Sequence, residues 1–406
     1  MTKTLSALML STALVAGFAT AAFAQDKNVK IGVLNDQSGL YADLAGPGSV
    51  LAAQMAVEDS GLTAKGWKIE VISGDHQNKP DIGVNIARQW IDVEKVDVIS
   101  DVPTSSVALA INNLVKEKNS ILLNSGAGTS DLTNSHCTAN TIHWTYDTYM
   151  LANGTGSALT KSGGDTWFFL TADYAFGAAL ERDTTAAVTA NGGKVVGSVK
   201  HPLNTSDFSS FLLQAQASKA KVIGLANAGG DTINSIKQAS EFGIVKGGQK
   251  LAGLLMFLSD VNALGLNIAQ GLNMTETFYW DLNDGTRAFS KRFQERAKNK
   301  AMPTMVQAGV YSSLIHYFKT LDKLGSNPHD GAKVVAAMKG MPVDDPLFGK
   351  GTIEPNGRNV HDAYLFEVKS PSESKGPWDY YKLVSKIPAD KAFTPLDKST
   401  CPLLKK

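Results

Sequence analysis

Apolar residues along the chain recur alternately at the spacing of strands and at the spacing of helices. In residues 47–60, Val50, Leu51 and Met55 fall on one side of a helix, and Pro47 stands in the first turn, where helices accept proline. Up to residue 123 the pattern predicts strands at residues 29–34, 68–73, 96–99 and 121–123, alternating with helices at residues 47–60, 80–93 and 105–117. Strands separated by helices indicate a parallel, doubly wound α/β sheet.

The same alternation starts again after Ala152. It predicts strands at residues 166–170, 194–199, 221–225 and 251–257, helices at 176–191, 208–218 and 231–242, further helices at 287–299 and 306–324, and closing strands at 363–369 and 380–384. Two similar units in tandem predict two α/β lobes that face each other across a cleft. We assign residues 27–145 plus 278–360 to the first lobe and residues 146–277 plus 361–406 to the second.

The first 24 residues have the composition of a secretory signal peptide. Lys3 supplies the positive start, residues 5–22 are almost all apolar or small, and an A-x-A sequence at residues 22–24 fits the usual cleavage site. No cysteine that could carry a lipid follows this site, and no later stretch reaches the roughly 18 apolar residues of a membrane span. We expect residues 1–24 to be removed, which leaves 382 of the 406 residues as a soluble protein outside the cytoplasm.

Charge and cysteine content narrow the range of partners. The chain has 39 basic and 38 acidic residues, of which the signal peptide contains only Lys3, so no electrostatic attraction to nucleic acid or anionic lipid is expected. Cys137 and Cys401 are the two cysteines, and they suit an oxidising compartment and a single disulfide. Two free thiols are the alternative, because the sequence does not show how close the two Cα atoms come.

Signatures of the common cofactor and metal enzymes are missing from the sequence. Gly126-x-Gly128 lacks the third glycine of a dinucleotide loop, and no G-x-S-x-G elbow of a hydrolase is present. The spacing of His136, Cys137 and His143 matches no common zinc pattern. We therefore predict a protein without cofactor, metal site or catalytic residues.

Two loops rich in hydroxyl groups and glycine follow two successive predicted strands. Thr104 and Ser105 open a helix after the first of these strands, and Gly128 and Thr129 follow the second. Ligands of α/β sheets bind beyond the carboxyl ends of the strands, so adjacent strands would bring these loops to one spot beside a helix N-terminus. We expect an anion site there, most simply for a carboxylate, with each hydrogen bond contributing about 1.5–3 kcal/mol. N-capping of the helices alone is the alternative.

The order of several short motifs resembles the periplasmic solute-binding proteins of ABC importers, in particular the branched-chain amino acid receptor subgroup. These motifs are IGVL at residues 31–34, TSS at 104–106, SGAGT at 125–129 and DYAFG at 173–177. The resemblance covers nearly the whole mature chain. It implies a type I periplasmic binding protein, with two Rossmann-like lobes joined by a three-crossing hinge that trap a ligand on closure. It also implies a periplasmic monomer that delivers its ligand to a membrane ABC permease.

The resemblance further implies which residues contact the ligand. The amino-acid receptors of this family place an acidic residue after the strand at residues 254–258 to pair with the ligand's ammonium, whereas Met256 and Phe257 stand there and Asp260 comes several residues later. A buried ammonium without a counter-charge would cost several kcal/mol. The carboxylate grip falls on Thr104, Ser105, Ala127, Gly128 and Thr129, with Tyr41 or Leu44 and the covering ring of Phe176 lining the cleft.

Apolar and aromatic residues in place of the acid favour an aromatic carboxylate of benzoate or phenylpropanoid type. Met256, Phe257 and Phe176 would form the wall, with Tyr279 beyond a crossing between the lobes, and lobe core is the alternative role for Met256 and Phe257. Tyr41, Tyr174 and Asp281 are candidates for reading a ring hydroxyl. A branched-chain or other amino acid receptor is the alternative within the family.

A secreted α/β hydrolase is the alternative from another class. It would use the hydroxyl loops as an oxyanion hole and needs a nucleophile paired with a base. His76, His143 and His201 have no obvious serine partner in the sequence. We therefore expect a binding protein and no enzyme.

Overall fold

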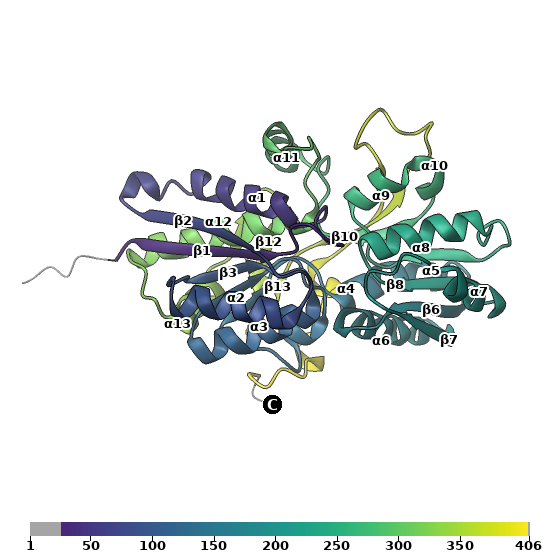
Figure 1. The fold of residues 1–406 in the computed structure, drawn as a ribbon, viewed down its shortest axis with the longest axis horizontal. Helices are drawn as coiled ribbons and strands as arrows, with labels where there is room; N and C mark the ends of the chain where they lie inside the picture. Colours follow the sequence, from purple (N-terminus) through teal and green to yellow (C-terminus); the bar gives the residue numbers. More distant parts are fainter. Residues whose placement is uncertain (1–25, 405–406) are drawn as a thin grey trace, which may run out of the picture.

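The computed structural model describes residues 26–404 and consists of two α/β halves that lie side by side (Figure 1). The predicted signal peptide, residues 1–24, lies outside the described part. Each half is built on its own parallel sheet, and we call them lobe 1 and lobe 2 in chain order. No helix within residues 26–404 is both long enough and apolar enough to cross a bilayer.

Lobe 1 contains a five-stranded sheet in the order β2-β1-β3-β4-β5, with every neighbouring pair parallel. Its strands are β1 (Asn28–Asn35), β2 (Lys68–Asp75), β3 (Val98–Asp101), β4 (Ile121–Asn124) and β5 (Thr141–His143). Helices cover both faces: α1 (Gly46–Asp59), α2 (Pro80–Asp92), α3 (Ser105–Lys118), α12 (Met305–Leu324) and α13 (Gly331–Lys339). The last two arrive from far along the chain and complete the lobe.

Lobe 2 repeats the design with four parallel strands in the order β7-β6-β8-β9. The strands are β6 (Thr166–Ala172), β7 (Lys194–His201), β8 (Val222–Ala226) and β9 (Lys250–Gly253). Its helices are α5 (Ser157–Lys161), α6 (Ala175–Ala190), α7 (Ser209–Ala217), α8 (Gly230–Glu241), α9 (Leu258–Leu264) and α10 (Leu266–Ala269). The two-lobed α/β fold predicted above is confirmed.

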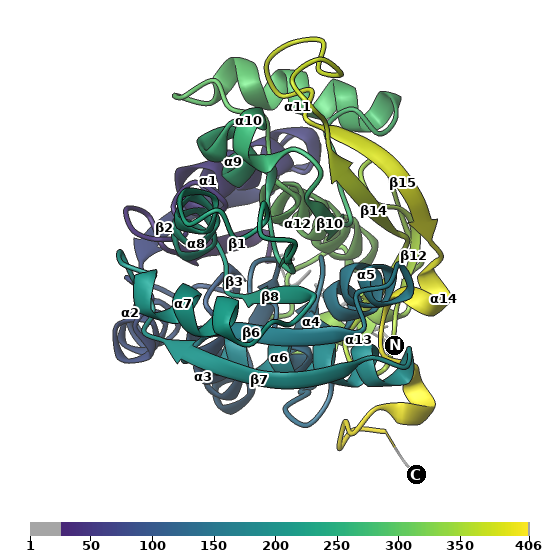
Figure 2. The same ribbon diagram turned by 90° about the vertical axis from the view of Figure 1, so that its right-hand side faces the viewer.

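Two small antiparallel sheets complete the molecule (Figure 2). The order β10-β14-β15 is formed by β10 (Asn273–Glu276), β14 (Ala363–Val368) and β15 (Tyr381–Ile387). The order β11-β12-β13 is formed by β11 (Val343–Asp345), β12 (Gly349–Ile353) and β13 (Asn359–Val360). Three short or outlying helices are α4 (Thr148–Leu151), α11 (Asp284–Arg296) and α14 (Ala389–Ala392).

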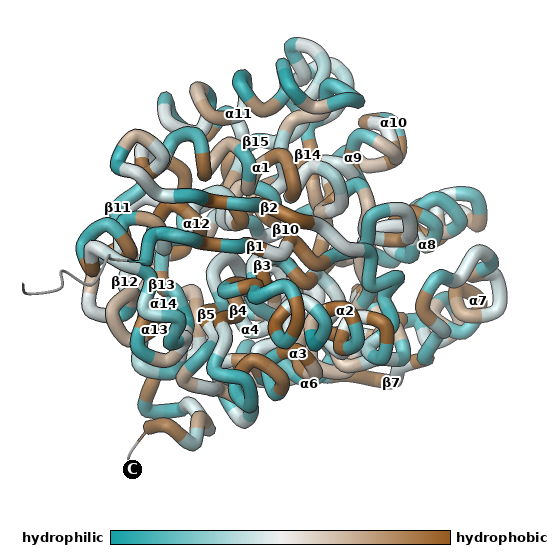
Figure 3. Tube along the Cα trace, turned by 60° about the vertical axis from the view of Figure 1, so that its left-hand side comes forward, coloured by the Kyte–Doolittle hydropathy of each residue, from teal (hydrophilic) through white to brown (hydrophobic). Residues whose placement is uncertain are grey.

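Apolar side chains gather between the sheets and the helices that cover them. In Figure 3 the brown, apolar stretches run through the strands and adjoining helix turns, whereas teal, polar residues predominate on the outer loops. Helix α12 is buried along most of its length and packs on α1 and on β3 and β4. At its start the Thr304 hydroxyl donates to the Leu44 carbonyl at 2.6 Å, which fixes the beginning of α1 at the edge of the cleft.

One predicted strand is shorter than expected. The apolar run at residues 251–257 predicts a strand throughout, but β9 ends at Gly253 and the chain then bends toward α9. Met256 folds back onto Gly253, where a side chain on the glycine would lie 2.2 Å from the Met256 sulfur. The second half of the run is therefore buried lobe core without strand pairing.

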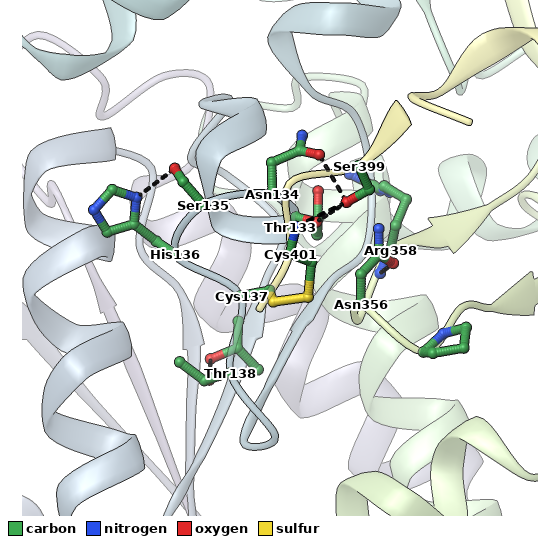
Figure 4. The surroundings of a disulfide bond; sticks show 12 residues. Thr133, Asn134, Ser135, His136, Cys137, Thr138, Asn356, Arg358, Ser399 and Cys401 are labelled. Carbon is green, nitrogen blue, oxygen red and sulfur yellow. Dashed lines mark hydrogen bonds between the residues drawn. A yellow bond between two sulfur atoms is a disulfide. The ribbon is translucent and has the colours of Figure 1, made fainter. Parts of the chain in front are cut away.

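The structure joins Cys137 and Cys401 in a disulfide, with Cα atoms 5.5 Å apart (Figure 4). Ser399 adds hydrogen bonds to the Thr133 carbonyl at 3.3 Å and to the Asn134 side chain at 2.9 Å. Our division assigned all of residues 361–406 to the second lobe. The end of that range is instead fixed to lobe 1, because covalent and hydrogen bonds hold it against residues 133–137.

Candidate functional site

A cavity of about 10 Å³ lies between the two lobes. From the lobe 1 side it is lined by Tyr41, Leu44, Pro103, Gly126, Gly128 and Tyr146. From the lobe 2 side it is lined by Tyr174, Phe176, Ala228, Leu255 and Phe257. No charged side chain is among these residues, and the small volume shows that the lobes close almost completely on one another. A larger molecule enters only when the lobes move apart.

Two larger hollows, of about 490 and 710 Å³, lie at the ends of the sheets where strands begin, away from the cavity between the lobes. The first is lined by Ile121 at the start of β4, and the second by Lys250 at the start of β9. The cavity between the lobes is instead reached by the loops that follow the strands. Because ligands of open α/β sheets bind beyond the carboxyl ends of the strands, we place the candidate site between the lobes.

Parallel pairing of β3 with β4 brings the two hydroxyl loops together. Asp101 and Asn124 are partners at the ends of these strands, so the following loops leave the sheet side by side. The Thr129 N–H donates to the Ser105 hydroxyl oxygen at 3.2 Å. The loops that the sequence predicted to meet are therefore in direct contact.

Not all the predicted hydroxyl groups are free to bind a ligand. The Thr104 hydroxyl donates to the Asn78 side chain, and the Thr129 hydroxyl accepts from the Asp131 N–H at 3.3 Å. Ser105 accepts the bond from Thr129, and its own proton has no acceptor among the described residues. The Thr129 hydroxyl likewise donates to no acceptor among the described residues, so Ser105 and Thr129 can both still donate a hydrogen bond.

The second hydroxyl loop, residues 125–129, approaches the cavity with its backbone at Gly128. The Ala127 N–H donates to the Asn124 side chain at 3.3 Å, while Gly128 lines the cavity directly. A side chain on Gly128 would lie 2.8 Å from the Phe176 ring and 3.0 Å from the Tyr146 ring. Only glycine lets the backbone come this close to the aromatic residues.

Four helices begin at the rim of the cavity. Each N-cap residue lies within one position of a cavity-lining residue: Ala45 for α1, Thr104 for α3, Tyr174 for α6 and Gly229 for α8. In none of these helices does the N-cap side chain accept a hydrogen bond from the first turn. The first N–H groups of a helix lack intrahelical partners and carry a partial positive charge, so the cavity is electropositive without a basic side chain.

Aromatic rings form the walls. Phe176 lies beside Tyr174 with ring centroids 6.1 Å apart, and Tyr146 meets Phe257 edge-on at 6.1 Å. The Tyr146 hydroxyl donates to the Gly126 carbonyl, which fixes this ring against the second loop. Flat apolar molecules suit such walls.

Two tyrosine hydroxyls meet across the cleft. Tyr41 lies on the loop after β1, and Tyr174 is the N-cap of α6 on the other lobe. Their oxygen atoms are 2.6 Å apart. Burial raises the pKa of both hydroxyls, so both are neutral at physiological pH.

Thr104, Ser105, Ala127 and Thr129 belong to the two hydroxyl loops but are not among the residues that line the cavity. Three further residues considered from the sequence are engaged elsewhere. Met256 is packed in the core of lobe 2. The Tyr279 ring stacks on Tyr381 at 4.9 Å, and its hydroxyl donates to the Trp378 carbonyl at 3.1 Å. Asp281 forms an exposed ion pair with Arg287 at 3.0 Å. Of the predicted contacts, Tyr41, Leu44, Gly128, Phe176 and Phe257 line the cavity.

The buried acids near the cleft in lobe 2 are engaged elsewhere. Asp260 accepts the Phe257 N–H at 3.0 Å at the start of α9, and burial raises its pKa to about 7. Asp231 accepts the N–H groups of Asn204 and Thr205 at 3.1 and 2.8 Å, and burial raises its pKa to about 6. Neither carboxylate lines the cavity.

Asp101 is a functional candidate that the sequence reasoning missed. Its carbonyl accepts the N–H groups of Ser125 and Gly126 at 3.3 and 3.2 Å, so it holds the start of the second loop. One carboxylate oxygen accepts from the Asn35 amide at 2.8 Å, and the other is buried without a partner among the described residues. Asp101 and Val102 both have left-handed backbone angles, with φ of 82° and 54°, a conformation that concentrates at functional sites.

A cluster of polar contacts links the lobes at the rim. Arg182 on α6 pairs with Asp131 of lobe 1 at 3.0 Å and with its neighbour Asp183 at 2.8 Å. Asp183 in turn accepts the hydroxyl groups of Ser130 and Thr148. These contacts hold the two lobes together on the side of α6.

Comparison with known proteins identifies the family. The model of the periplasmic binding protein family matches residues 28–377. The chain belongs to this family. Family membership implies a periplasmic location for this binding protein.

Solved structures of related proteins have the same fold. A periplasmic binding protein from Burkholderia mallei is 52% identical, with a TM-score of 0.90 over 93% of this chain and 100% of that one. A branched-chain amino acid ABC transporter periplasmic ligand-binding protein from Burkholderia xenovorans LB400 is 42% identical, with a TM-score of 0.81 over 92% and 99%. An ABC transporter solute-binding protein from Rhodopseudomonas palustris BisB5, in complex with 3,4-dihydroxybenzoic acid, is 26% identical, with a TM-score of 0.81 over 92% and 100%.

Proposed function

We propose that this binding protein captures a small aromatic carboxylate of benzoate or phenylpropanoid type between its lobes and delivers it to an ABC permease. Closure around the ligand is favoured by the difference in its affinity for the open and closed forms. The signal peptide, residues 1–24, is removed on export, and the mature protein acts as a monomer in the periplasm.

The observation that carries this proposal is an uncharged aromatic cavity surrounded by four uncapped helix N-termini. Partial positive charge at helix starts stabilises an anion, and the ring walls accept an apolar body. Ser105, Thr129 and the backbone N–H of Gly128 would supply donors to a bound carboxylate on the lobe 1 side. Phe176, Tyr146 and Phe257 enclose the ring.

Amino acids fit this cavity less well. A ligand ammonium would have no carboxylate among the cavity-lining residues, because Asp231 and Asp260 are bonded to backbone N–H groups of lobe 2. Leaving that charge unpaired would cost several kcal/mol. The complex of the Rhodopseudomonas protein with a dihydroxybenzoic acid supports an aromatic acid, whereas the description of the Burkholderia xenovorans protein keeps a branched-chain amino acid as the alternative.

The hydrogen bonds among the described residues give little support to a hydrolase function. Such an enzyme needs a nucleophile in hydrogen-bond contact with a base. Among the described residues, the serine–histidine hydrogen bond joins Ser135 to His136 on an exposed loop beside the disulfide (Figure 4). Neither residue lines the cavity between the lobes.

Thermal unfolding and calorimetric titration of the mature protein test the proposal. Benzoate and 4-hydroxycinnamate should raise the melting temperature, and leucine and valine should not. A ligand at 100 times its Kd stabilises the folded state by about 2.7 kcal/mol. Stabilisation by leucine without stabilisation by either aromatic acid would contradict the proposal, and release of a product from a bound ester or amide would favour the hydrolase.

Two serine variants locate the anion grip. Ser105→Ala removes one of the free donors and should weaken binding of the aromatic acid by about 1.5–3 kcal/mol. Ser106→Ala is the matched control, because Ser106 is the next residue of α3, is half-buried and forms no side-chain hydrogen bond among the described residues. Equal effects of the two substitutions would argue against Ser105 as a ligand contact.

A further inference from the structure

The hydroxyl groups of Tyr41 and Tyr174 share one hydrogen bond, and one of their two protons has no acceptor. Both groups carry their protons, and a single bond of 2.6 Å joins the two oxygens. A tyrosine hydroxyl donates one hydrogen bond and can accept others, so only one of the two protons lies between the oxygens. The described residues offer no further hydrogen-bond acceptor to the pair.

This unpaired donor faces an apolar space. Both tyrosines line the cavity together with Leu44, Pro103 and Phe176. A buried donor without an acceptor is unfavourable, and the penalty is removed when an incoming oxygen accepts the bond. The position therefore calls for an oxygen atom on the ligand.

The tyrosine pair and the second hydroxyl loop both adjoin the Phe176 ring. Gly128 of the second loop approaches one edge of this ring, with the glycine's ideal side-chain position 2.8 Å from ring carbon Cε2. Tyr174 lies beside the same ring, with centroids 6.1 Å apart. A ligand ring beside Phe176 therefore lies near both the second loop and the tyrosine pair.

We propose that Tyr41 and Tyr174 select aromatic acids that carry an oxygen on the ring, such as phenolic acids. The inference rests on the proposed function and specifies the ligand further. The ring oxygen accepts from the free tyrosine proton, and a phenolic proton can donate in return. Because the two tyrosines belong to different lobes, the ring oxygen bridges the lobes in the closed form.

The competing explanation is a latch that only holds the lobes together. A latch would contribute equally to the binding of every ligand that requires closure. A specificity contact would act only on ligands with the ring oxygen. Comparison of ligands that differ at this one position separates the two explanations.

Calorimetric titration of the mature protein with 4-hydroxybenzoate, 4-methylbenzoate and benzoate provides the test. The methyl and hydroxyl groups have similar size, so their comparison isolates the hydrogen bond. The wild-type protein should bind 4-hydroxybenzoate about tenfold more tightly than 4-methylbenzoate. Tyr41→Phe and Tyr174→Phe should each reduce this preference to about twofold or less, with the Kd for 4-methylbenzoate within about twofold of wild type.

A tyrosine outside the cavity supplies the matched control. Tyr149 on α4 is half-buried, does not line the cavity, and its hydroxyl has no partner among the described residues. Tyr149→Phe should keep the tenfold preference. The same loss of preference in this variant would overturn the inference.

The outcomes distinguish this inference from the proposed function. Equal binding of the three acids, or a preference that survives both cavity substitutions, overturns the role of the tyrosines and leaves the aromatic acid receptor intact. Equal losses for 4-hydroxybenzoate and 4-methylbenzoate in the variants establish the latch and also overturn the inference. Absence of binding by all three acids overturns the inference, and absence of 4-hydroxycinnamate binding as well overturns the proposed function.

Discussion

Replacement of Asp101 by asparagine should stabilise the protein, and the gain should appear only above the acidic range of pH. Asp101 is completely buried at the end of β3, and one carboxylate oxygen has no partner among the described residues. Burial raises its pKa from 3.8 to about 6, against the opposing effect of the hydrogen bond from Asn35. Asparagine keeps the acceptor for the Asn35 amide and tolerates the left-handed backbone at this position.

The expected gain follows from the difference between the two pKa values. A pKa of about 6 in the folded protein against an ordinary 3.8 corresponds to about 3 kcal/mol. Between these values the folded protein binds the proton more strongly than the unfolded chain, so stability falls as the pH rises from about 4 to about 6. Above about pH 6 the ionised Asp101 carboxylate lowers the stability of the folded protein by the full amount of about 3 kcal/mol. The asparagine variant has no such proton, so its advantage should grow to about 3 kcal/mol across this window.

Urea unfolding of both proteins, in steps from about pH 4 to about pH 8, measures this difference. Other buried acids also titrate, but they are common to both proteins and cancel in the comparison. A constant difference between variant and wild type at every pH would refute the assignment of a buried, unpaired carboxylate to Asp101.

Asp147 offers a matched contrast. It is equally buried and burial raises its pKa to about 6, but its carboxylate lies 3.7 Å from the Arg358 guanidinium and accepts the Met150 N–H at 2.9 Å. Asp147→Asn removes the charge opposite a buried cation and should destabilise the protein near neutral pH, by about 3–5 kcal/mol. Opposite signs for the two substitutions would show that the surroundings of each aspartate decide its effect.

Three further predictions concern the disulfide, the cavity and the rim. Chain entropy over the separation of 264 residues sets an upper limit of about 5.6 kcal/mol on the stability lost when Cys137 and Cys401 are replaced by serine. Thermal unfolding of this variant should match that of the reduced wild type, because neither protein has the disulfide. Gly128→Val should abolish titration by aromatic acids while circular dichroism stays unchanged, because its side chain would enter the space of the Phe176 ring; retained binding would contradict the assigned site. Arg182→Ala should weaken ligand binding about two- to fivefold at low salt and less at high salt, and an effect independent of salt would contradict an ionic role at the rim.

The arrangement of strands and helices was predictable because their apolar spacing is regular. Residues 29–34 and 96–99 are apolar runs that end in polar loops, and the helices between them place apolar residues on one face. The run at residues 251–258 gave no such boundary, because strand and buried bend are both apolar there. Hydrophobicity reports burial at such a position and does not report backbone conformation.

The meeting of the two hydroxyl loops was also predictable, since parallel strand order alone brings them together. Which donors stay free was not, because this depends on contacts between distant residues. The Thr104 hydroxyl is used by Asn78, which is 26 positions earlier in the chain. Tyr279 packs in the core against Tyr381 and does not line the cavity. The direction in which such a side chain points cannot be inferred from the spacing of residues in the sequence.

Asp101 had a weak signal in the sequence. An acidic residue directly after an apolar strand, followed by a valine and Pro103, is unusual for a solvent-exposed loop, but the sequence does not show that no basic residue approaches it. Buried and exposed carboxylates look alike in a sequence. The structure distinguishes buried from exposed carboxylates, because it shows the burial and the hydrogen-bond partners of each one.

The late position of α12 in the chain affects how the protein is made. This helix covers α1 and the central strands of lobe 1, yet it is synthesised after every strand of the lobe 2 sheet. A nascent chain that ends near residue 145 therefore has all five strands of lobe 1 and lacks the helix that covers one face of their sheet. The ribosome must complete most of the polypeptide before the first half of the molecule can reach its native packing, and a fragment containing only that half should aggregate.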